Sequence, residues 1–458
     1  MIQSINHTKN NEIQNALTPP SGAGGLYIIL ISFIAALGGL LFAFDAAIIS
    51  GVVPFIQAKF SLSGTETGWI VSSLVLGCTV GVILSGAPAD IFGRKKPLML
   101  SAFLFLIAVI GEALTNSAGI FVVFRAFAGF SVGISSMVSP MYIAEIAPAK
   151  RRGQLVSLYQ FTIVIGILLG FMSNSLLVNT GGDDNWRIML SVMIVPAILF
   201  LVGLFFVPES PRWLIQQNQG GKALQTLQRI NGDADATKEF ETISKSLTDK
   251  SDSSYKAVFA PAMRLPLFVG VGLAVLQQIT GINAIMYYAP TIFAKSGLSV
   301  DSAIFQTILV GVINLVFSLI AVFVVDKLGR KPLLVIGSSL MTISLLTVAA
   351  SFAYNLDSII TLTAILVFIA SFAVSLGPVT WVMISEVFPN NVRGKAMSIS
   401  IVSLWLACFF VALLFPILLE KIGIGNTFLV FAFFSFVSLL FNLKFVKETK
   451  GKELEEIN

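Results

Sequence analysis

The chain has 458 residues, of which 56% are hydrophobic and only 12% carry a charged side chain, and its mean hydropathy is +0.89. A soluble globular domain is about one quarter charged, so this composition excludes a soluble protein and predicts one that crosses a membrane many times. The single histidine, His7, lies in the polar first stretch, which excludes histidine-based metal sites, proton relays and catalytic triads from the membrane portion. Cys78 and Cys408 lie within apolar segments and are predicted to be small buried residues, not a disulfide or a zinc site.

Apolar runs of about 20 residues, the length that crosses a bilayer, predict an all-α integral membrane protein with twelve transmembrane helices. The polar remainder is predicted to form a tail at 1–25, a linker at 208–262 between two six-helix bundles (26–207 and 263–446), and a second tail at 447–458. The expected helices are residues 26–56, 67–88, 96–115, 119–145, 154–178, 186–207, 263–294, 303–325, 332–353, 359–387, 396–419 and 426–446.

Lysine and arginine concentrate in alternate loops, which predicts that both termini are cytoplasmic. The loops that carry them contain Arg94, Lys95, Lys96, Lys150, Arg151, Arg152, Lys327, Arg330, Lys331, Arg393 and Lys395. Because these charges flank apolar segments, the pI of about 9.1 reflects membrane topology, and no nucleic-acid partner is expected. In the linker, Ser210-Pro211 resembles the start of a helix, and residues 222–230 and 238–247 have the spacing of short amphipathic helices.

The two bundles repeat each other. The run Gly93–Leu98 returns as Gly329–Leu333, and Glu145–Gly153 returns as Glu386–Gly394 at nearly the same spacing. A duplicated half built around a midplane site is the architecture of alternating-access transporters.

Polar side chains are dense in Leu276–Pro290, within a segment that should cross the membrane. An amide without a partner in the bilayer costs several kcal/mol. These groups therefore either join neighbouring helices or line a site for a ligand rich in hydroxyls, and their density favours the site. They are Gln277, Gln278, Thr280, Asn283, Tyr287 and Tyr288.

Asp45 and Arg125 are the clearest ionisable residues within predicted membrane helices. A charge inside the membrane is a functional hypothesis by default; the alternative is a permanent structural pair. The Gly22–Gly25 run follows no strand, and the sequence shows no phosphate loop, metal cluster or nucleophile–base pair, so neither an enzyme nor a cofactor is expected.

Six motifs in order resemble the sugar porter branch of the major facilitator superfamily, over residues 26–451. The resemblance implies two helical bundles that rock around a central sugar site. The motifs are GAPADIFGRKKPL (86–98), RAFAGFSVGISSMVSPMYIAEIAPAKRRG (125–153), PESPRWL (208–214), QQITGINAIMYYAP (277–290), DKLGRKPL (326–333) and GPVTWVMISEVFPNNVRG (377–394).

The resemblance implies a sugar site built from amides, which match hydroxyls, and aromatic rings, which match the apolar face of a pyranose. Leu404 stands where the family usually has a polar amide, which leaves the preferred sugar open. The implied ligands are Gln160, Gln277, Gln278, Asn283, Asn314 and Trp381, with Phe42 and Trp405 as walls and Tyr287 closing the extracellular side.

The resemblance also implies a network of ion pairs that joins the cytoplasmic ends in the outward-facing state; solvated anchors are the alternative. Each exposed pair is worth about 0–1 kcal/mol, so only a network would bias the conformation. Its expected members are Asp90, Arg94, Glu145, Arg152, Glu209, Arg212, Asp326, Arg330, Glu386 and Arg393.

The function expected from the resemblance is import of a monosaccharide, a pentose or hexose such as xylose or glucose, by proton symport with alternating access. Asp45 and Arg125 would couple the proton, since the family's proton-coupled members have aspartate at this position. The alternatives are a facilitative uniporter of the same fold, a proton symporter of a polyol such as inositol, and a non-transporting sugar receptor. The expected setting is the cell inner membrane, with sugar, proton and lipid bilayer as partners and a monomeric chain.

Overall fold

A computed structural model describes residues 23–148, 151–231, 233–248, 255–389 and 392–450. The described residues form helices and no strands, and twelve helical segments are long and apolar enough to cross a membrane, which confirms the predicted fold class.

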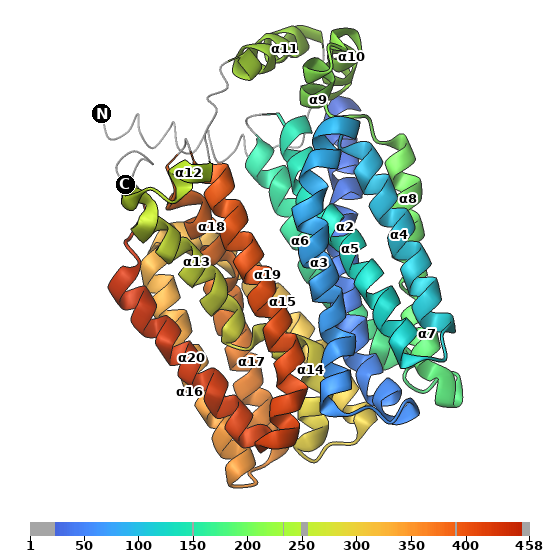
Figure 1. Ribbon diagram of the computed structural model, residues 1–458, viewed down its shortest axis with the longest axis vertical. Helices are drawn as coiled ribbons and strands as arrows, with labels where there is room; N and C mark the ends of the chain where they lie inside the picture. The colour runs from blue at the N-terminus through green and yellow to red at the C-terminus, as the bar shows by residue number, and fades with distance from the viewer. Residues whose placement is uncertain (1–22, 149–150, 232, 249–254, 390–391, 451–458) are drawn as a thin grey trace.

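The first half contains six spans, drawn from blue to green in Figure 1. The sixth is broken into two helices at Val192–Met193, although the sequence predicts one continuous helix. The helices are α2 (Ala23–Lys59), α3 (Gly64–Phe92), α4 (Lys95–Leu114), α5 (Ala118–Ile146), α6 (Arg152–Leu177), the 3-10 turn η2 (Gly182–Asp184), α7 (Asn185–Ser191) and α8 (Ile194–Phe206).

The second half, drawn from yellow-green to red, also contains six spans, of which the first and fourth are each broken in two. The helices are η3 (Pro261–Met263), α13 (Arg264–Ile279), α14 (Ile282–Lys295), α15 (Val300–Leu328), α16 (Arg330–Ala353), α17 (Ser358–Val374), α18 (Leu376–Glu386), α19 (Arg393–Lys421) and α20 (Gly423–Phe445).

Four short helices lie between the halves in sequence and together at one end of the molecule, which we call the linker face (Figure 1). They are α9 (Pro211–Gln216), α10 (Gly220–Asn231), α11 (Asp233–Thr248) and α12 (Tyr255–Val258). As the sequence predicts, Ser210 caps α9, because its hydroxyl accepts a hydrogen bond from the Trp213 N–H and proline occupies the first turn. We call the opposite end of the molecule the far face.

Glycine allows helices of the first half to approach closely. A Cβ at Gly77 or Gly129 would collide with the backbone of the facing helix in the α3–α5 pair, and Gly166 has the same relation to Leu40 of α2. Without a hydrophobic driving force in lipid, such close packing is what holds membrane helices together.

The two halves meet at the far face and their ribbons diverge toward the linker face (Figure 1). At the far face the Gly64 N–H donates to Glu420 Oε2 at 2.9 Å, so a carboxylate of α19 satisfies the first turn of α3. Trp69 of α3 and Phe409 of α19 pack edge to face, with 5.9 Å between ring centroids.

Two spans of the second half are broken near the middle of their length. The first is at Thr280–Gly281, where Gly281 has a φ of 93°, a conformation that glycine adopts without strain. The second is at Ser375, two residues before the Gly377-Pro378 pair. Broken helices beside a midplane site are a recurrent feature of transporters.

Candidate functional site

The polar stretch that the sequence singles out forms a connected chain of amides across the break between α13 and α14. Gln278 Nε2 donates to Gln277 Oε1 at 3.3 Å, and Asn283 Nδ2 donates to Gln278 Oε1. The break is what brings these residues together, because it turns the last residues of α13 toward the first turn of α14. Asn283 Nδ2 also donates to Cys408 Sγ of α19 at 3.1 Å, so a cysteine predicted only to be a small buried residue contacts the amide chain.

Gln277 links the two broken spans. Its Nε2 donates to the Leu376 carbonyl at 2.8 Å and to the Gly377 carbonyl at 3.2 Å, both in the first turn of α18. Its side chain is 3% exposed, so these bonds satisfy an amide that would otherwise be costly in the membrane. Gln277 therefore joins neighbouring helices, as one of the two interpretations of the polar stretch expects, whether or not it also binds a ligand.

Two aromatic residues expected to line the site face each other from opposite halves. Phe42 of α2 and Trp405 of α19 pack edge to face, with ring centroids 5.4 Å apart. This is a favourable geometry for aromatic pairs, and it places both residues where the halves meet. Leu404, the residue before the tryptophan, is buried.

The remaining expected ligands differ in exposure. Asn314 of α15 and Tyr287 of α14 are buried, whereas Trp381 of α18 is 41% exposed and Gln160 of α6 is exposed. The adjacent Tyr288 has non-helical angles two residues before Pro290, and its hydroxyl donates to the Ala412 carbonyl at 3.0 Å. Proline removes a helix hydrogen bond, which accounts for the kink.

Asp45 and Arg125 form an ion pair in the first half. Arg125 Nη1 lies 2.6 Å from Asp45 Oδ1, and the two side chains are 1% and 0% exposed. Asp45 Oδ2 and Arg125 Nε have no hydrogen-bond partner among the described residues. The pair that the sequence suggests therefore exists, fully enclosed and on the opposite half from the amide chain.

A third buried ionisable residue, Glu112 of α4, joins this pair and was missed by the sequence reasoning. Glu112 Oε2 lies 3.6 Å from the same Nη1 of Arg125, and its side chain is 0% exposed. Glu112 comes two residues before the end of α4, so its position near the end of an apolar run resembles that of an interfacial residue. The sequence did contain one sign of this residue, because Glu112 is the only ionisable residue between Ser101 and Leu114.

At the linker face of the first half, the charged motifs converge on one arginine. Arg94 Nη2 lies 2.8 Å from Glu145 Oε1 and 3.4 Å from Asp90 Oδ1. Glu209 accepts the backbone N–H groups of Arg94, Lys95 and Ser210. Gly93 is needed at this point because its φ is 89° and a Cβ there would collide with Glu209.

The second half repeats this cluster with different residues. Arg330 Nη2 lies 3.2 Å from Glu386 Oε1, and Glu448 Oε1 and Oε2 accept the backbone N–H groups of Arg330 and Lys331. Thr449 Oγ1 donates to Glu386 Oε2 at 2.6 Å, as Ser210 Oγ does to Glu145. Glu448 thus matches Glu209, although the sequence assigns it only to a tail.

Hydrogen bonds affect the pKa of the Glu448 carboxyl group, which lies beyond the last span. Partial burial would raise its pKa, but the N–H groups of Lys450, Arg330, Lys331 and Thr449 bond the charged form. The pKa of Glu448 is therefore below its ordinary value of 4.5.

The described pairs of the expected network each join helices of the same half. Glu145 contacts Arg94 instead of the sequence neighbour Arg152, which is exposed, and Arg212 is exposed as well. Arg393 Nε donates to the Phe388 carbonyl at 3.2 Å. The side chain of Asp326 lies outside the described residues.

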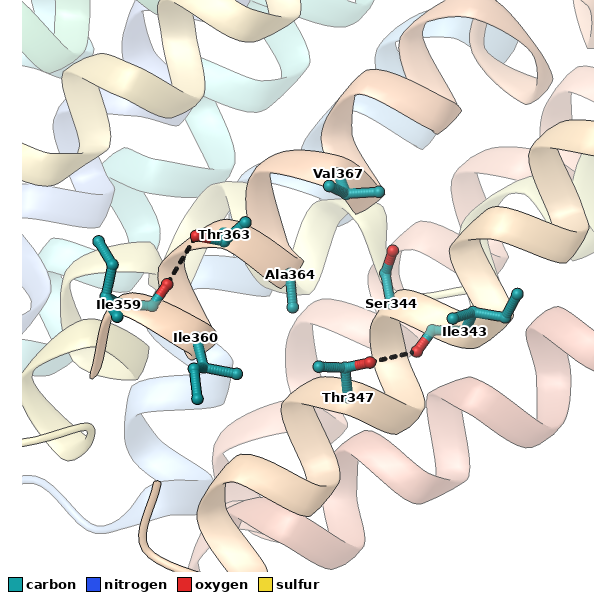
Figure 2. Close-up of a pocket in the computed structure, with 8 residues that line it drawn as sticks. All are labelled: Ile343, Ser344, Thr347, Ile359, Ile360, Thr363, Ala364 and Val367. Carbon is teal, nitrogen blue, oxygen red and sulfur yellow. Dashed lines mark hydrogen bonds between the residues drawn. The ribbon is translucent and has the colours of Figure 1, made fainter. Parts of the chain in front are cut away.

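A groove of about 350 Å³ lies between α16 and α17 (Figure 2), and its lining includes no residue of the amide chain. Its lining is mostly aliphatic, and Thr347 and Thr363 donate to carbonyls of their own helices. Because Ile343 and Ile359 are exposed on a membrane span, this groove faces lipid and does not provide the polar contacts that a sugar needs.

Comparison with known proteins agrees with the fold and with the motifs. The family model "Sugar (and other) transporter" matches residues 31–458. The arabinose-proton symporter of Bacillus subtilis (strain 168) is 40% identical over 437 residues, which are 94% of each chain. The D-xylose-proton symporter of Escherichia coli (strain K12) is 39% identical over 469 residues, 94% of this chain and 95% of that one. The xylose transporter XylE from E. coli in its inward open conformation superposes with a TM-score of 0.84 at 38% identity, covering 94% of this chain and 99% of that chain.

Proposed function

Because this chain belongs to the sugar (and other) transporter family, whose model matches residues 31–458, we propose that it imports a monosaccharide by proton symport with alternating access. It is a multi-pass membrane transporter and not an enzyme. The observation that supports proton coupling is the buried Asp45–Arg125 pair, in which Arg125 Nη1 lies 2.6 Å from Asp45 Oδ1. A carboxylate enclosed with one arginine can switch between a paired, ionised form and a released, protonated form.

The sugar would bind between the halves, with the amide chain of α13 and α14 on one side and Gln160 of α6 on the other. Gln277, Gln278 and Asn283 offer donors and acceptors to hydroxyl groups, while Phe42 and Trp405 offer apolar faces. Asn314 and Trp381 would add contacts, and Tyr287 would close the extracellular side.

A pentose is the sugar class that the relatives favour, since the two named above are symporters of arabinose and D-xylose. A hexose such as glucose, or a polyol such as inositol, would use the same amides. Competition of pentoses, hexoses and inositols against uptake in energised vesicles distinguishes these substrates.

We place the linker face in the cytoplasm of the cell, with the chain in the inner membrane as a monomer. The concentration of Lys and Arg at the ends of spans on this face supports the orientation. With this orientation we infer an inward-facing state, which is supported by the contact of Gly64 with Glu420 at the far face. In the outward-facing state the linker-face clusters of both halves would come together as a gate.

Proton coupling supplies the energy for accumulation. A membrane potential of about 100 mV supplies about 2.3 kcal/mol per charge, which sustains roughly a fifty-fold gradient of a neutral sugar.

The test is Asp45→Asn in proteoliposomes. We expect this variant to lose sugar accumulation driven by a pH gradient while it retains sugar counterflow, which needs no proton gradient. Asp183→Asn, which removes an exposed carboxylate from η2, is the matched control and should accumulate sugar normally. If Asp45→Asn still concentrates sugar, or if wild-type uptake fails to alkalinise a weakly buffered medium, the chain is a uniporter and Asp45 is structural.

A further inference from the structure

The cluster around Arg125 contains more negative groups than one arginine can neutralise. Two carboxylates, Asp45 and Glu112, approach the same Nη1 atom at 2.6 and 3.6 Å, and all three side chains are at most 1% exposed. If both were ionised, the enclosed cluster would carry a net negative charge, which costs several kcal/mol per uncompensated ion. One of the two carboxyl groups must therefore hold a proton.

The geometry identifies which group holds it in this state. Asp45 Oδ1 accepts a short hydrogen bond from Arg125, whereas the Glu112 contact is too long for one. Neither oxygen of Glu112 has a hydrogen-bond partner among the described residues. Asp45 is thus the ionised partner, and Glu112 is the neutral acid.

The surroundings of Glu112 supply no other cation that pairs with it in the described structure. Its helix, α4, packs against α2, α3, α5, α7 and α8. Arg187 of α7 donates instead to the carbonyls of Ala113 and Thr115 and pairs with Asp184. Lys59 of α2 also pairs with Asp184, Glu66 caps its own helix at Ser63, and α8 carries no ionisable residue.

We propose that Glu112 is a second proton-carrying residue, which shares one proton with Asp45 and pairs with Arg125 whenever Asp45 is protonated. In the exchange, the proton of the Glu112 carboxyl group passes to the Asp45 carboxylate, and the Arg125 hydrogen bond moves from Asp45 to Glu112. Asp45 then releases this proton to the cytoplasm while Glu112 takes up another from the outside, so one proton crosses the membrane in each cycle. The cluster stays neutral throughout. Asp45 can then take up a proton without leaving a buried arginine unpaired.

This inference rests on the proposed proton symport and makes a distinct prediction for Glu112→Gln, which mimics the neutral acid. While Asp45 is ionised, this variant should behave like wild type. Once Asp45 is protonated, however, Arg125 lacks a carboxylate partner, so protonation becomes less favourable. The midpoint of the acid stimulation of sugar uptake should move to lower pH by about one unit, a tenfold change in proton affinity.

The experiment measures initial sugar uptake into proteoliposomes against external pH for wild type, Glu112→Gln, Glu112→Asp and the exposed control Asp183→Asn. Glu112→Asp should have a midpoint closer to wild type, and Asp183→Asn should match wild type. A uniform fall in rate with the midpoint unchanged would show that Glu112 only supports packing. Wild-type uptake that lacks acid stimulation would instead refute the proposed symport, and with it the shared proton.

Infrared spectroscopy gives a second readout that does not depend on transport or on recovery of Glu112→Gln. The carbonyl-stretch intensity of one neutral carboxylic acid should be lost in Asp45→Asn, because Glu112 then ionises to pair with Arg125. If this intensity persists in Asp45→Asn, Glu112 is permanently protonated and the exchange does not occur.

Discussion

The side-chain amide of Gln277 donates to the main-chain carbonyl of Leu376 at 2.8 Å, and this contact helps to join the two broken spans of the second half. This bond gives Gln277 a structural role that Asn283 lacks. Asn283 is half-buried and contacts Gln278 of the same amide chain and, through a weak hydrogen bond to sulfur, Cys408 of α19. The two amides should therefore respond differently to substitution.

We expect Asn283→Ala to weaken sugar binding about two- to tenfold with little change in thermal stability. A hydrogen bond to a neutral group contributes about 0.5–1.5 kcal/mol. Gln277→Leu should weaken binding and also lower the melting temperature, since α18 loses its tie to α13. Equilibrium sugar binding and thermal unfolding in detergent measure both effects. The exposed Asn426→Ala is the control and should change neither quantity; equal melting temperatures for Gln277→Leu and wild type would contradict the structural role.

Hydropathy predicted the twelve spans because each is a long apolar run, and the structure confirms their number. The break at Thr280–Gly281 was not predicted, because Ile279 and Ile282 continue the apolar pattern on either side. The helix is interrupted at Gly281, which has a positive φ. Glycine adopts positive and negative φ about equally well, so its presence in a sequence does not predict which one occurs.

The charged residues show where sequence reasoning reached its limit. Asp45 and Arg125 were paired correctly because both lie deep in apolar runs. Glu112 was missed because its depth depends on how far α4 tilts against α5, which composition does not specify. The contacts of Glu145 with Arg94, and of Glu448 with Arg330, join motifs that are distant in sequence. They could not be predicted without knowing how the helices pack.

Closure at the far face depends on Gly68, where an added Cβ would collide with the Leu413 carbonyl of α19. Overpacking costs about 1–3 kcal/mol, so we expect Gly68→Ala to slow counterflow about tenfold while sugar binding is retained. Gly86→Ala is the matched control in the same helix, because its Cβ would lie 3.6 Å from Met137 and cause no collision.

A labelling experiment tests whether the lost rate reflects a shifted conformation. Ala294 lines a groove of about 430 Å³ at the far face between α2 and α14. Ala294→Cys should react faster with a thiol reagent in the Gly68→Ala background, because the halves spend more time apart there. Unchanged labelling would mean that Gly68 does not control closure.

The carboxylate of Glu448 should stabilise the folded protein in a pH-dependent way. Its pKa in the folded state is below the ordinary value of 4.5, because backbone N–H groups bond the charged form and outweigh partial burial. A lowered pKa contributes stability that is fully present above about pH 4.5 and is lost as pH falls through the folded-state pKa. Glu448→Gln should therefore melt at a lower temperature than wild type at neutral pH, and the difference should shrink in acid. Thermal unfolding in detergent across this pH range measures it, with the exposed linker variant Glu241→Gln as control. A difference that stays constant down to the acid limit would show that packing, and not the charge on Glu448, holds the last residues against α16.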